Sequence, residues 1–370
     1  MKKGPAGGDE KWMSRALALA RKGKGRTAPN PAVGAVIVKN GRIVGEGWHK
    51  KAGEPHAEAL ALLQAGPAAR GASVYVTLEP CNHHGRTGPC AQALIQARVR
   101  EVFIGARDLS PKPGPRGMEA LKRAGVKVAM GPLAAECLLL VEDFSRHSST
   151  GLPFVTVKFA MTLDGKIAAK SGDGRWISSE KSRRMVHSMR NQMDAVMIGA
   201  DTAMADDPEL TVRGLRGGRN PLRAVVDGRL RLPLNGRLAR TAAKIPTVVF
   251  TTTSMAAGRK AQALRRLGAQ VEAAGKGARV DLRRALAILG KMNVMSLLVE
   301  SGGVLAWELA RKSLVDEILV FVAPKIVGGG RCAMGAGGME KMAQALDISG
   351  LSVVSSGPDV LLRGRLDKGR

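Results

Sequence analysis

A histidine, a glutamate and two cysteines in the first third of the chain have the residue types and spacing of a catalytic zinc site. His56 stands two residues before Glu58, and Cys81, directly after a proline, is followed by Cys90. One imidazole and two thiolates leave the fourth tetrahedral position of zinc open to a water, whose pKa falls to about 7. Glu58 is placed to take a proton from that water and to pass it to a leaving amine. The pattern predicts a zinc-dependent deaminase, with Glu58 as catalytic residue and the other three as ligands.

The alternative for the same residues is a structural zinc knuckle, which needs a fourth ligand. His49, His83 or His84 would be available for that role. The H-x-E pattern followed by Pro-Cys favours catalysis, because both motifs fall in the strand and helix context that a deaminase requires. Eight residues separate the two cysteines, where nucleic-acid and free-base deaminases have two. The insertion contains two histidines and Arg86, so we expect it to meet an anionic group of the substrate.

Length and composition favour a two-domain protein of a reducing compartment. The chain has 370 residues and 45% hydrophobic content, which is too long for one compact core. It has no run of eighteen apolar residues and starts without the apolar region of a signal peptide, so we expect a cytoplasmic protein with no membrane partner. Four scattered cysteines do not make a disulfide framework, which leaves the first two free for metal.

The formal net charge of +27 raises the question of a nucleic-acid partner. The charge is spread along the chain, with 23 Lys and Arg against 12 Asp and Glu in residues 1–150 and 35 against 19 in residues 151–370. One tyrosine and six phenylalanines leave few platforms on which single-stranded bases could stack. We therefore expect a solvated basic surface and small phosphate-bearing substrates, with no nucleic-acid partner.

Hydrophobic periodicity predicts that residues 1–145 form a mixed sheet sandwiched by helices, with zinc at the helix N-termini. A covering helix over 10–24 precedes a hairpin whose turn is marked by Asn40-Gly41. The predicted strands are 33–38, 43–47, 74–78, 101–105 and 126–130, and the further helices are 55–64, 91–97 and 117–124.

A polar stretch over 146–151 predicts a short linker to a second domain. Strands are expected over 154–160, 194–199, 224–228, 247–250 and 297–300, and edge strands over 351–354 and 360–362. Ser179 is suited to cap a helix that carries Arg184, His187 and Arg190. The last long strand runs into Ser301-Gly302-Gly303 and a helix over 304–311, which is a phosphate-binding geometry but not a dinucleotide fingerprint.

Three stretches of the first domain together resemble one enzyme family. They are Pro29-Asn30-Pro31 with Val33-Gly34, Gly53-Glu54-Pro55-His56-Ala57-Glu58, and the metal loop from Leu78 to Cys90. These motifs are similar to those of the bifunctional riboflavin biosynthesis deaminase–reductases, and the extended loop is the most specific of them. The resemblance implies a cytidine-deaminase-like three-layer domain that hydrolyses the 2-amino group of a diaminopyrimidine carrying phosphoribosylamine.

The resemblance also implies the residues that contact this substrate. They are Asn30 and His49, with His83 serving the base and Arg86 the phosphate. The usual family loop has serine after the first cysteine and two prolines before the second, where this chain has Asn82 and Gly88. The metal ligands are unaffected by these departures.

Residues 153–330 resemble the reductase half of the same family, whose fold is similar to dihydrofolate reductase. The matching stretches are 158–165, 176–178, 205–208 with 210–213, and 300–303. The resemblance implies hydride transfer from NADPH to C1 of the ring-opened ribose, with Lys158 polarising the open-chain substrate. The implied cofactor contacts are Ala160, Trp176, Thr202, Asp206, Gly228, Gly302 and Gly303. The implied substrate contacts are Lys158, Gly174, Arg190, Leu210, Arg213 and Glu300.

The predicted protein is therefore a two-step enzyme of riboflavin biosynthesis. Residues 1–150 are the zinc-dependent pyrimidine deaminase domain and residues 151–370 the NADPH-dependent reductase domain, and further copies of the chain are the expected protein partners. The alternatives are a zinc-dependent nucleic-acid base deaminase and a catalytically inactive basic scaffold that binds RNA. Neither accounts for the 220 reductase-like residues that follow the metal motif.

Overall fold

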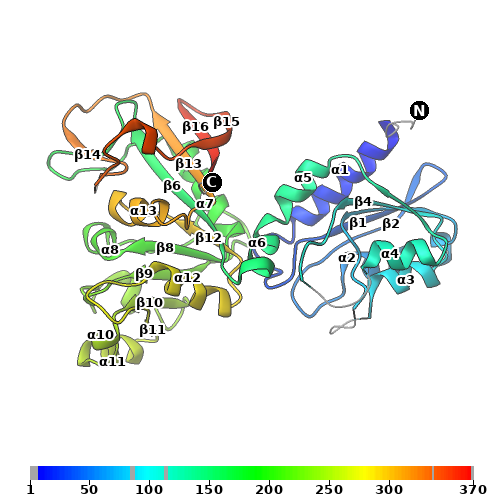
Figure 1. Cartoon of the computed structure of the whole chain (residues 1–370), viewed down its shortest axis with the longest axis horizontal. Helices are drawn as coiled ribbons and strands as arrows, with labels where there is room; N and C mark the ends of the chain where they lie inside the picture. Colours follow the sequence, from blue (N-terminus) through cyan, green and yellow to red (C-terminus); the bar gives the residue numbers. More distant parts are fainter. Residues whose placement is uncertain (1–6, 84–87, 112–115, 336, 368–370) are drawn as a thin grey trace. The chain divides into compact units, whose positions relative to one another are not determined.

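The computed structural model describes residues 7–83, 88–111, 116–335 and 337–367 and divides the chain into two units, residues 1–151 and 152–370 (Figure 1). Each unit is built around its own large sheet. Within the described residues, no helix is both long and apolar enough to span a bilayer.

The sheet of the first unit is mixed, as predicted, with strand order β2-β1-β3-β4-β5. β1 is antiparallel to both of its neighbours, whereas β3, β4 and β5 are parallel. Side chains alternate between the two faces, so Ala35 and Ile37 pack into the core beneath α2, α3 and α4, while α1 and α5 cover the other face (Figure 1). The strands are β1 (Gly34–Lys39), β2 (Arg42–Trp48), β3 (Ser73–Leu78), β4 (Glu101–Ala106) and β5 (Lys127–Met130).

Three helices of this unit, η1, α5 and α6, were not predicted from the sequence, and α6 lies where the linker was expected. Residues 146–150 belong to α6, which begins with the acidic residues Glu142 and Asp143 and has Gly151, whose φ is 71°, as its C-cap. The two units do meet in the sequence at residue 151, where the linker was expected, but the stretch before it is helical, because a polar composition does not distinguish a solvated helix from a loop. The helices are α1 (Gly7–Arg21), α2 (Ala57–Ala65), η1 (Gly66–Ala69), α3 (Cys90–Gln96), α4 (Gly117–Arg123), α5 (Ala134–Leu140) and α6 (Glu142–Thr150).

Two glycines of β2 allow α2 to approach the sheet closely. A Cβ on Gly47 would stand 2.5 Å from the carbonyl oxygen of Ala57 and 2.7 Å from the Cβ of Leu60, and one on Gly45 would collide with the carbonyl of Ala61. Because Ala57 opens the helix that carries Glu58, the position of that carboxylate depends on the absence of these side chains.

We predict that Gly47→Ala destabilises the first unit by about 1–3 kcal/mol, the range for overpacking, and lowers the zinc content of the purified protein. Thermal unfolding and elemental analysis measure the two effects. Gly8→Ala is the matched control, since nothing lies within 4 Å of a Cβ at that position. Unchanged stability and zinc content in Gly47→Ala would show that α2 adjusts without affecting the metal site.

The second unit has a nine-stranded sheet of order β11-β10-β9-β8-β12-β6-β13-β16-β15, and β14 and β7 form a separate ribbon. The strands from β11 to β13 are parallel, while β16 and β15 are antiparallel. The strands are β6 (Phe154–Thr162), β7 (Lys166–Ala169), β8 (Ala195–Gly199), β9 (Leu222–Val226), β10 (Thr247–Thr251), β11 (Gln270–Ala273), β12 (Ser296–Val299), β13 (Glu317–Ala323), β14 (Gly330–Cys332), β15 (Ile348–Ser356) and β16 (Asp359–Leu366).

One helix N-cap of this unit was predicted from the sequence and is present in the structure. Ser179 is the N-cap of α7 and its hydroxyl accepts a hydrogen bond from the backbone N–H of Ser182. The helices are α7 (Glu180–Gln192), α8 (Ala200–Asp206), α9 (Arg237–Arg240), α10 (Thr253–Ala256), α11 (Arg259–Arg266), α12 (Leu282–Lys291), α13 (Gly303–Ala310) and η2 (Met342–Gln344).

Two strand predictions near the end of the chain were incomplete. β13 was not predicted, although it lies between β6 and β16. Its first residue is the buried Glu317, which interrupts the apolar signal and is held by Arg363 at 2.5 Å. The stretch 360–362 was expected at an edge, but it lies in β16, between β13 and β15, so of the two predicted edge stretches only 351–354, in β15, lies at an edge.

Candidate active sites

The three predicted zinc ligands come together at the ends of three elements. His56 is the N-cap of α2, Cys81 follows β3, and Cys90 is the first residue of α3. The Nδ1 atom of His56 lies 3.5 Å from Sγ of Cys81 and 3.3 Å from Sγ of Cys90, and the three atoms all lie within 4.8 Å of one another. Tetrahedral zinc, with bonds of about 2.0–2.3 Å, places nitrogen and sulfur ligands roughly 3.5 Å apart. The donor set and its spacing therefore fit zinc.

Glu58 lies in the first turn of α2 and is buried beside this cluster. Burial, and then the negative charge of the Cys81 thiolate, raise the pKa of its carboxyl group to about 7. A carboxyl group with a pKa close to neutrality is suited to both accept and release a proton.

His49 has both ring nitrogens occupied by protein groups. Its Nδ1 lies 3.2 Å from the carbonyl oxygen of Pro55 and its Nε2 lies 3.1 Å from the side-chain nitrogen of Asn30. A proton on Nδ1 satisfies both contacts, because the carbonyl accepts and the amide donates. The ring packs edge-on against His56, with centroids 5.2 Å apart. His49 therefore supports the metal cluster and is not available as the fourth ligand of a structural knuckle.

The other predicted residues of this site belong to the metal loop. His83 is half-buried, two residues after Cys81, and Arg86 lies outside the described residues. Asn82 and Gly88, which differ from the usual family loop, stand on either side of this part of it. The Asn82 side chain accepts a hydrogen bond from Gln92 at 3.3 Å.

Glu79 is a supporting residue that the sequence analysis missed. It is buried at the end of β3, where one carboxylate oxygen accepts from the Met118 backbone N–H at 2.9 Å and the other from the Asp108 N–H at 3.3 Å. These bonds fasten the residues before Cys81 to α4 and to the chain after β4. An acidic residue between an apolar strand and Pro80-Cys81 was the available signal, since a buried carboxylate requires donors.

We predict that Glu79→Ala weakens zinc binding by about 10-fold, the low end of the range for partners that touch a metal ligand, because Glu79 holds the chain before Cys81 and not the ligand itself. Competition with a chromogenic chelator measures the affinity. Glu79→Gln should lose less, because its amide keeps one acceptor, and Glu119→Ala on the exposed face of α4 should match the unsubstituted protein. Equal zinc affinity in Glu79→Ala and Glu119→Ala would contradict the supporting role.

The second unit brings together three of the predicted charged residues from three elements. Glu300 follows β12 and pairs through both oxygens with Arg190 of α7, at 2.5 and 3.0 Å. Lys158 of β6 lies 3.8 Å from the same carboxylate. Burial acts to raise the pKa of Glu300, but Arg190 and Lys158 outweigh it and hold that pKa below its usual value. Burial lowers the pKa of Lys158.

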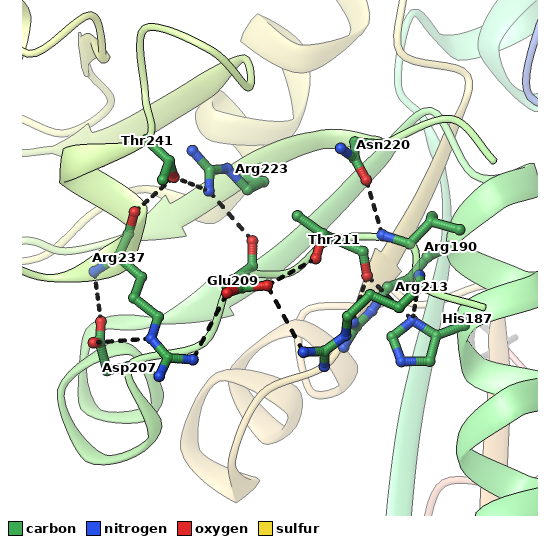
Figure 2. A network of polar contacts seen from close by, with 11 residues as sticks. His187, Arg190, Asp207, Glu209, Thr211, Arg213, Asn220, Arg223, Arg237 and Thr241 are labelled. Carbon is green, nitrogen blue, oxygen red and sulfur yellow. Dashed lines mark hydrogen bonds and ion pairs between the residues drawn. The ribbon is translucent and has the colours of Figure 1, made fainter. Parts of the chain in front are cut away.

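Leu210 and Arg213 lie beside this ion pair, on a segment without helix or strand between α8 and β9. The carbonyl oxygen of Thr211, between them, accepts a hydrogen bond from Nη1 of Arg190 at 3.0 Å (Figure 2). The Arg213 guanidinium is exposed and lies 3.7 Å from Glu209. Both residues are thus placed next to Arg190.

Among the predicted cofactor contacts, Thr202 and the Gly302-Gly303 turn lie together. The Thr202 hydroxyl accepts from the backbone N–H of Gly302 at 3.2 Å. Gly303 begins α13, and a Cβ there would stand 2.6 Å from the backbone nitrogen of Gly335. The Gly302 N–H is thus bonded to Thr202, and the N–H groups of the first turn of α13 are the ones that a phosphate would meet.

Arg175 joins Asp206 to the loop that holds Gly174 and Trp176. Its guanidinium donates to the Asp206 carbonyl at 2.7 Å and lies 3.5 Å from its carboxylate. Trp176 is 63% exposed, so its indole is available to a ligand. A Cβ on Gly174 would stand 2.8 Å from the carbonyl of Ile167.

Two further predicted cofactor contacts are placed elsewhere in the sheet. Ala160 is half-buried in β6 opposite Phe321. Gly228 follows β9, and its carbonyl accepts from the hydroxyls of Thr251 and Thr252 at 3.3 and 3.2 Å, so it belongs to the end of β9 and β10.

Comparisons with known proteins match each of the two units to a protein family. The family described as "RibD C-terminal domain" matches residues 153–362, and the "Cytidine and deoxycytidylate deaminase zinc-binding region" matches residues 7–106. The chain belongs to the RibD family. It is 40% identical to the riboflavin biosynthesis protein RibD of Aquifex aeolicus, covering 96% of this chain and 97% of that protein, and 40% identical to that of Escherichia coli, covering 96% and 98%.

Two solved structures align with nearly the whole chain. The deaminase/reductase of Thermotoga maritima aligns with a TM-score of 0.86 at 36% identity, and RibD of Acinetobacter baumannii, form 1, with 0.85 at 38%. Each alignment covers 97% of this chain and 99% of the other. As a RibD protein, the chain is a bifunctional enzyme of riboflavin biosynthesis, with a zinc-binding deaminase domain and an NADPH-dependent, dihydrofolate-reductase-like domain. The main sequence interpretation is confirmed over the two alternatives.

Proposed function

We propose that residues 1–150 deaminate 2,5-diamino-6-(5-phosphoribosylamino)pyrimidin-4(3H)-one and that residues 151–370 reduce the ribosyl group of the product to ribityl. The observation that carries the first assignment is the His56, Cys81 and Cys90 cluster with Glu58 buried beside it. The Thermotoga maritima relative is named as the deaminase and reductase for such phosphoribosylaminopyrimidines, which supports the substrate.

In the deaminase site, the chain supplies three ligands and a proton carrier. Zinc, when bound by His56, Cys81 and Cys90, supplies the Lewis acidity that makes a water nucleophilic near neutral pH. Glu58 takes a proton from the attacking water and delivers it to the departing amino group, so that ammonia leaves as the C–N bond breaks. Asn30 orients the substrate, and His49 acts through Asn30, whose side-chain nitrogen it holds at 3.1 Å. His83 is proposed at the base and Arg86 at the phosphate.

In the reductase site, the chain positions an anionic, open-chain sugar. NADPH supplies the hydride, and its proposed contacts are Ala160, Trp176, Thr202, Asp206, Gly228, Gly302 and Gly303. Lys158 polarises the carbon that is reduced, and its placement 3.8 Å from Glu300 keeps its ammonium oriented. Arg213, exposed beside Arg190, supplies a charge-assisted partner for the phosphate. Gly174, Leu210 and Glu300 complete the proposed substrate contacts.

We predict that the two activities separate cleanly by substitution. Glu58→Gln should keep its zinc but lose deamination by about 10²–10⁴-fold, because an amide does not carry the proton. The same variant should oxidise NADPH normally when given the deaminated compound. Arg213→Ala should deaminate normally and show a KM for reduction raised about 10–100-fold, since it loses a charge-assisted contact.

Each variant is assayed for ammonia release with the diaminopyrimidine and for NADPH absorbance with the deaminated compound, and zinc is measured by elemental analysis. Loss of reduction in a folded Glu58→Gln protein would replace the two-site proposal with a single shared site. Near-normal ammonia release in that variant would assign the proton transfer to another group.

The chain acts on a small molecule, and we propose that it does so in the cytoplasm as a homo-oligomer. β15 supports the oligomer, because it is the edge strand next to β16 (Figure 1) and exposes Leu351 and Val353 by 59% and 65%. An exposed apolar edge strand is a template for pairing with another chain.

We predict that the double substitution Leu351→Lys and Val353→Lys lowers the molar mass in solution to that of one chain, because charges on an edge strand oppose pairing. Size-exclusion chromatography with light scattering measures the mass. Leu63→Lys, at an equally exposed apolar position on α2, should leave it unchanged. A single-chain mass for the unsubstituted protein would refute the oligomer.

A further inference from the structure

The segment over residues 207–221 presents Leu210 and Arg213 without support from a sheet or helix of its own. Leu210 is buried in a left-handed conformation, with φ of 54°. Backbone N–H and C=O groups in such a segment still need partners. The side chains that supply these partners determine where Arg213 lies.

Three side chains hold the backbone of residues 211–213 (Figure 2). Arg190 donates to the Thr211 carbonyl at 3.0 Å, and the Asn220 side-chain oxygen accepts from the Val212 N–H at 2.8 Å. The third is His187, one turn before Arg190 on α7. Its Nδ1 lies 3.2 Å from the Thr211 carbonyl oxygen and 3.2 Å from the backbone nitrogen of Arg213.

One ring nitrogen cannot serve both of these partners at once. The Arg213 N–H requires an acceptor, which Nδ1 provides when the neutral ring carries its proton on Nε2. The Thr211 carbonyl already accepts from Arg190, so the neutral tautomer with its proton on Nε2 leaves both backbone groups satisfied. Nδ1 becomes a donor to Thr211 when the ring is protonated. The protonation state of His187 therefore decides whether it holds Arg213 or Thr211.

The charges around His187 favour the neutral ring. Burial, followed by the positive charges of Arg190 and Arg213, lowers the pKa of His187, and the Thr211 carbonyl and Glu300 oppose this shift. The groups that act on the ring thus come from α7, from the 207–221 segment and from the end of β12. Near neutral pH the ring is the acceptor for Arg213, and the Thr211 carbonyl is left to Arg190.

We propose that His187 is a positioning residue of the reductase site, which holds the backbone of Arg213 so that its guanidinium meets the substrate phosphate. Protonation turns Nδ1 toward the Thr211 carbonyl and releases the Arg213 N–H. His187 thereby makes binding of the phosphorylated substrate weaker in acid. This inference rests on the proposed contact between Arg213 and the phosphate.

The test compares KM and kcat for NADPH-dependent reduction of the deaminated compound at pH 8 and pH 5.5. His187→Ala should raise KM at pH 8 about two- to tenfold, the range for one net hydrogen bond, with kcat unchanged. His187→Asn should keep the KM of the unsubstituted protein at pH 8, because its amide oxygen accepts from the Arg213 N–H and does not titrate. The pH series continues below 5.5 as far as the protein stays folded, because burial lowers the pKa of His187. The unsubstituted protein should lose its advantage and approach His187→Ala as the pH falls through that lowered pKa.

The substrate phosphate itself titrates with a pKa of about 6, so the quantity to compare is the ratio of KM values between proteins at each pH. Arg184→Ala, on an exposed position of α7 whose side chain pairs with Glu180, should match the unsubstituted protein at every pH value. Thermal unfolding of every variant shows whether the fold is retained.

The outcomes separate this inference from the proposed site. A KM for His187→Ala equal to that of the unsubstituted protein, while Arg213→Ala raises KM, would overturn the role of His187 alone. A KM that is unchanged in Arg213→Ala would overturn the phosphate contact itself. A KM ratio that favours the unsubstituted protein over His187→Asn in acid would make His187 a direct ligand of the phosphate and refute the positioning role.

Discussion

The buried pair of Arg190 and Glu300 is the interaction on which the second unit's site depends. It joins α7 to the end of β12, and the same guanidinium reaches the Thr211 carbonyl in the irregular segment. Leaving one member of such a pair buried and alone costs about 3–5 kcal/mol, so the two charges hold each other and the segment in place. A second arginine holds the same irregular segment nearer its start: the buried Arg223 of β9 donates to the Glu209 carbonyl at 3.3 Å (Figure 2). Two arginines therefore hold a stretch of chain that has no regular structure.

The first unit organises its site by a different means. Its three metal ligands come from separate elements, and neighbouring backbone contacts bring them together. The glycines of β2 let α2 lie close to the sheet, and Glu79 fastens the end of β3 to α4. Two neighbouring thiolates repel one another when no cation lies between them, so the surrounding fold has to hold these ligands together.

The parts that could be predicted from the sequence are those with a local signal. His56, Glu58 and the two cysteines are recognisable because zinc restricts both ligand type and number, and most strands have continuous apolar runs. The parts that failed depend on partners far along the chain. α6 is polar on its surface, and β13 opens with Glu317, which is acceptable in a strand only because Arg363 lies beside it. The residues near Glu79 in the sequence do not indicate that the backbone N–H groups of Met118 and Asp108 donate to it.

The contrast between Arg190 and Arg213 shows why a ligand site needs both buried and exposed charges. Arg190 gives its Nε and Nη2 to Glu300 and its Nη1 to Thr211, so it is committed to the protein. Arg213 lies 3.7 Å from Glu209, and both side chains are largely exposed, which makes their pairing worth little in water. The phosphate proposed as the ligand of Arg213 would therefore replace Glu209 at little cost in free energy. The backbone of Arg213 is held, so the position from which its side chain extends is fixed. Its guanidinium is only weakly paired with Glu209, so a substrate anion would find this charge in place and available.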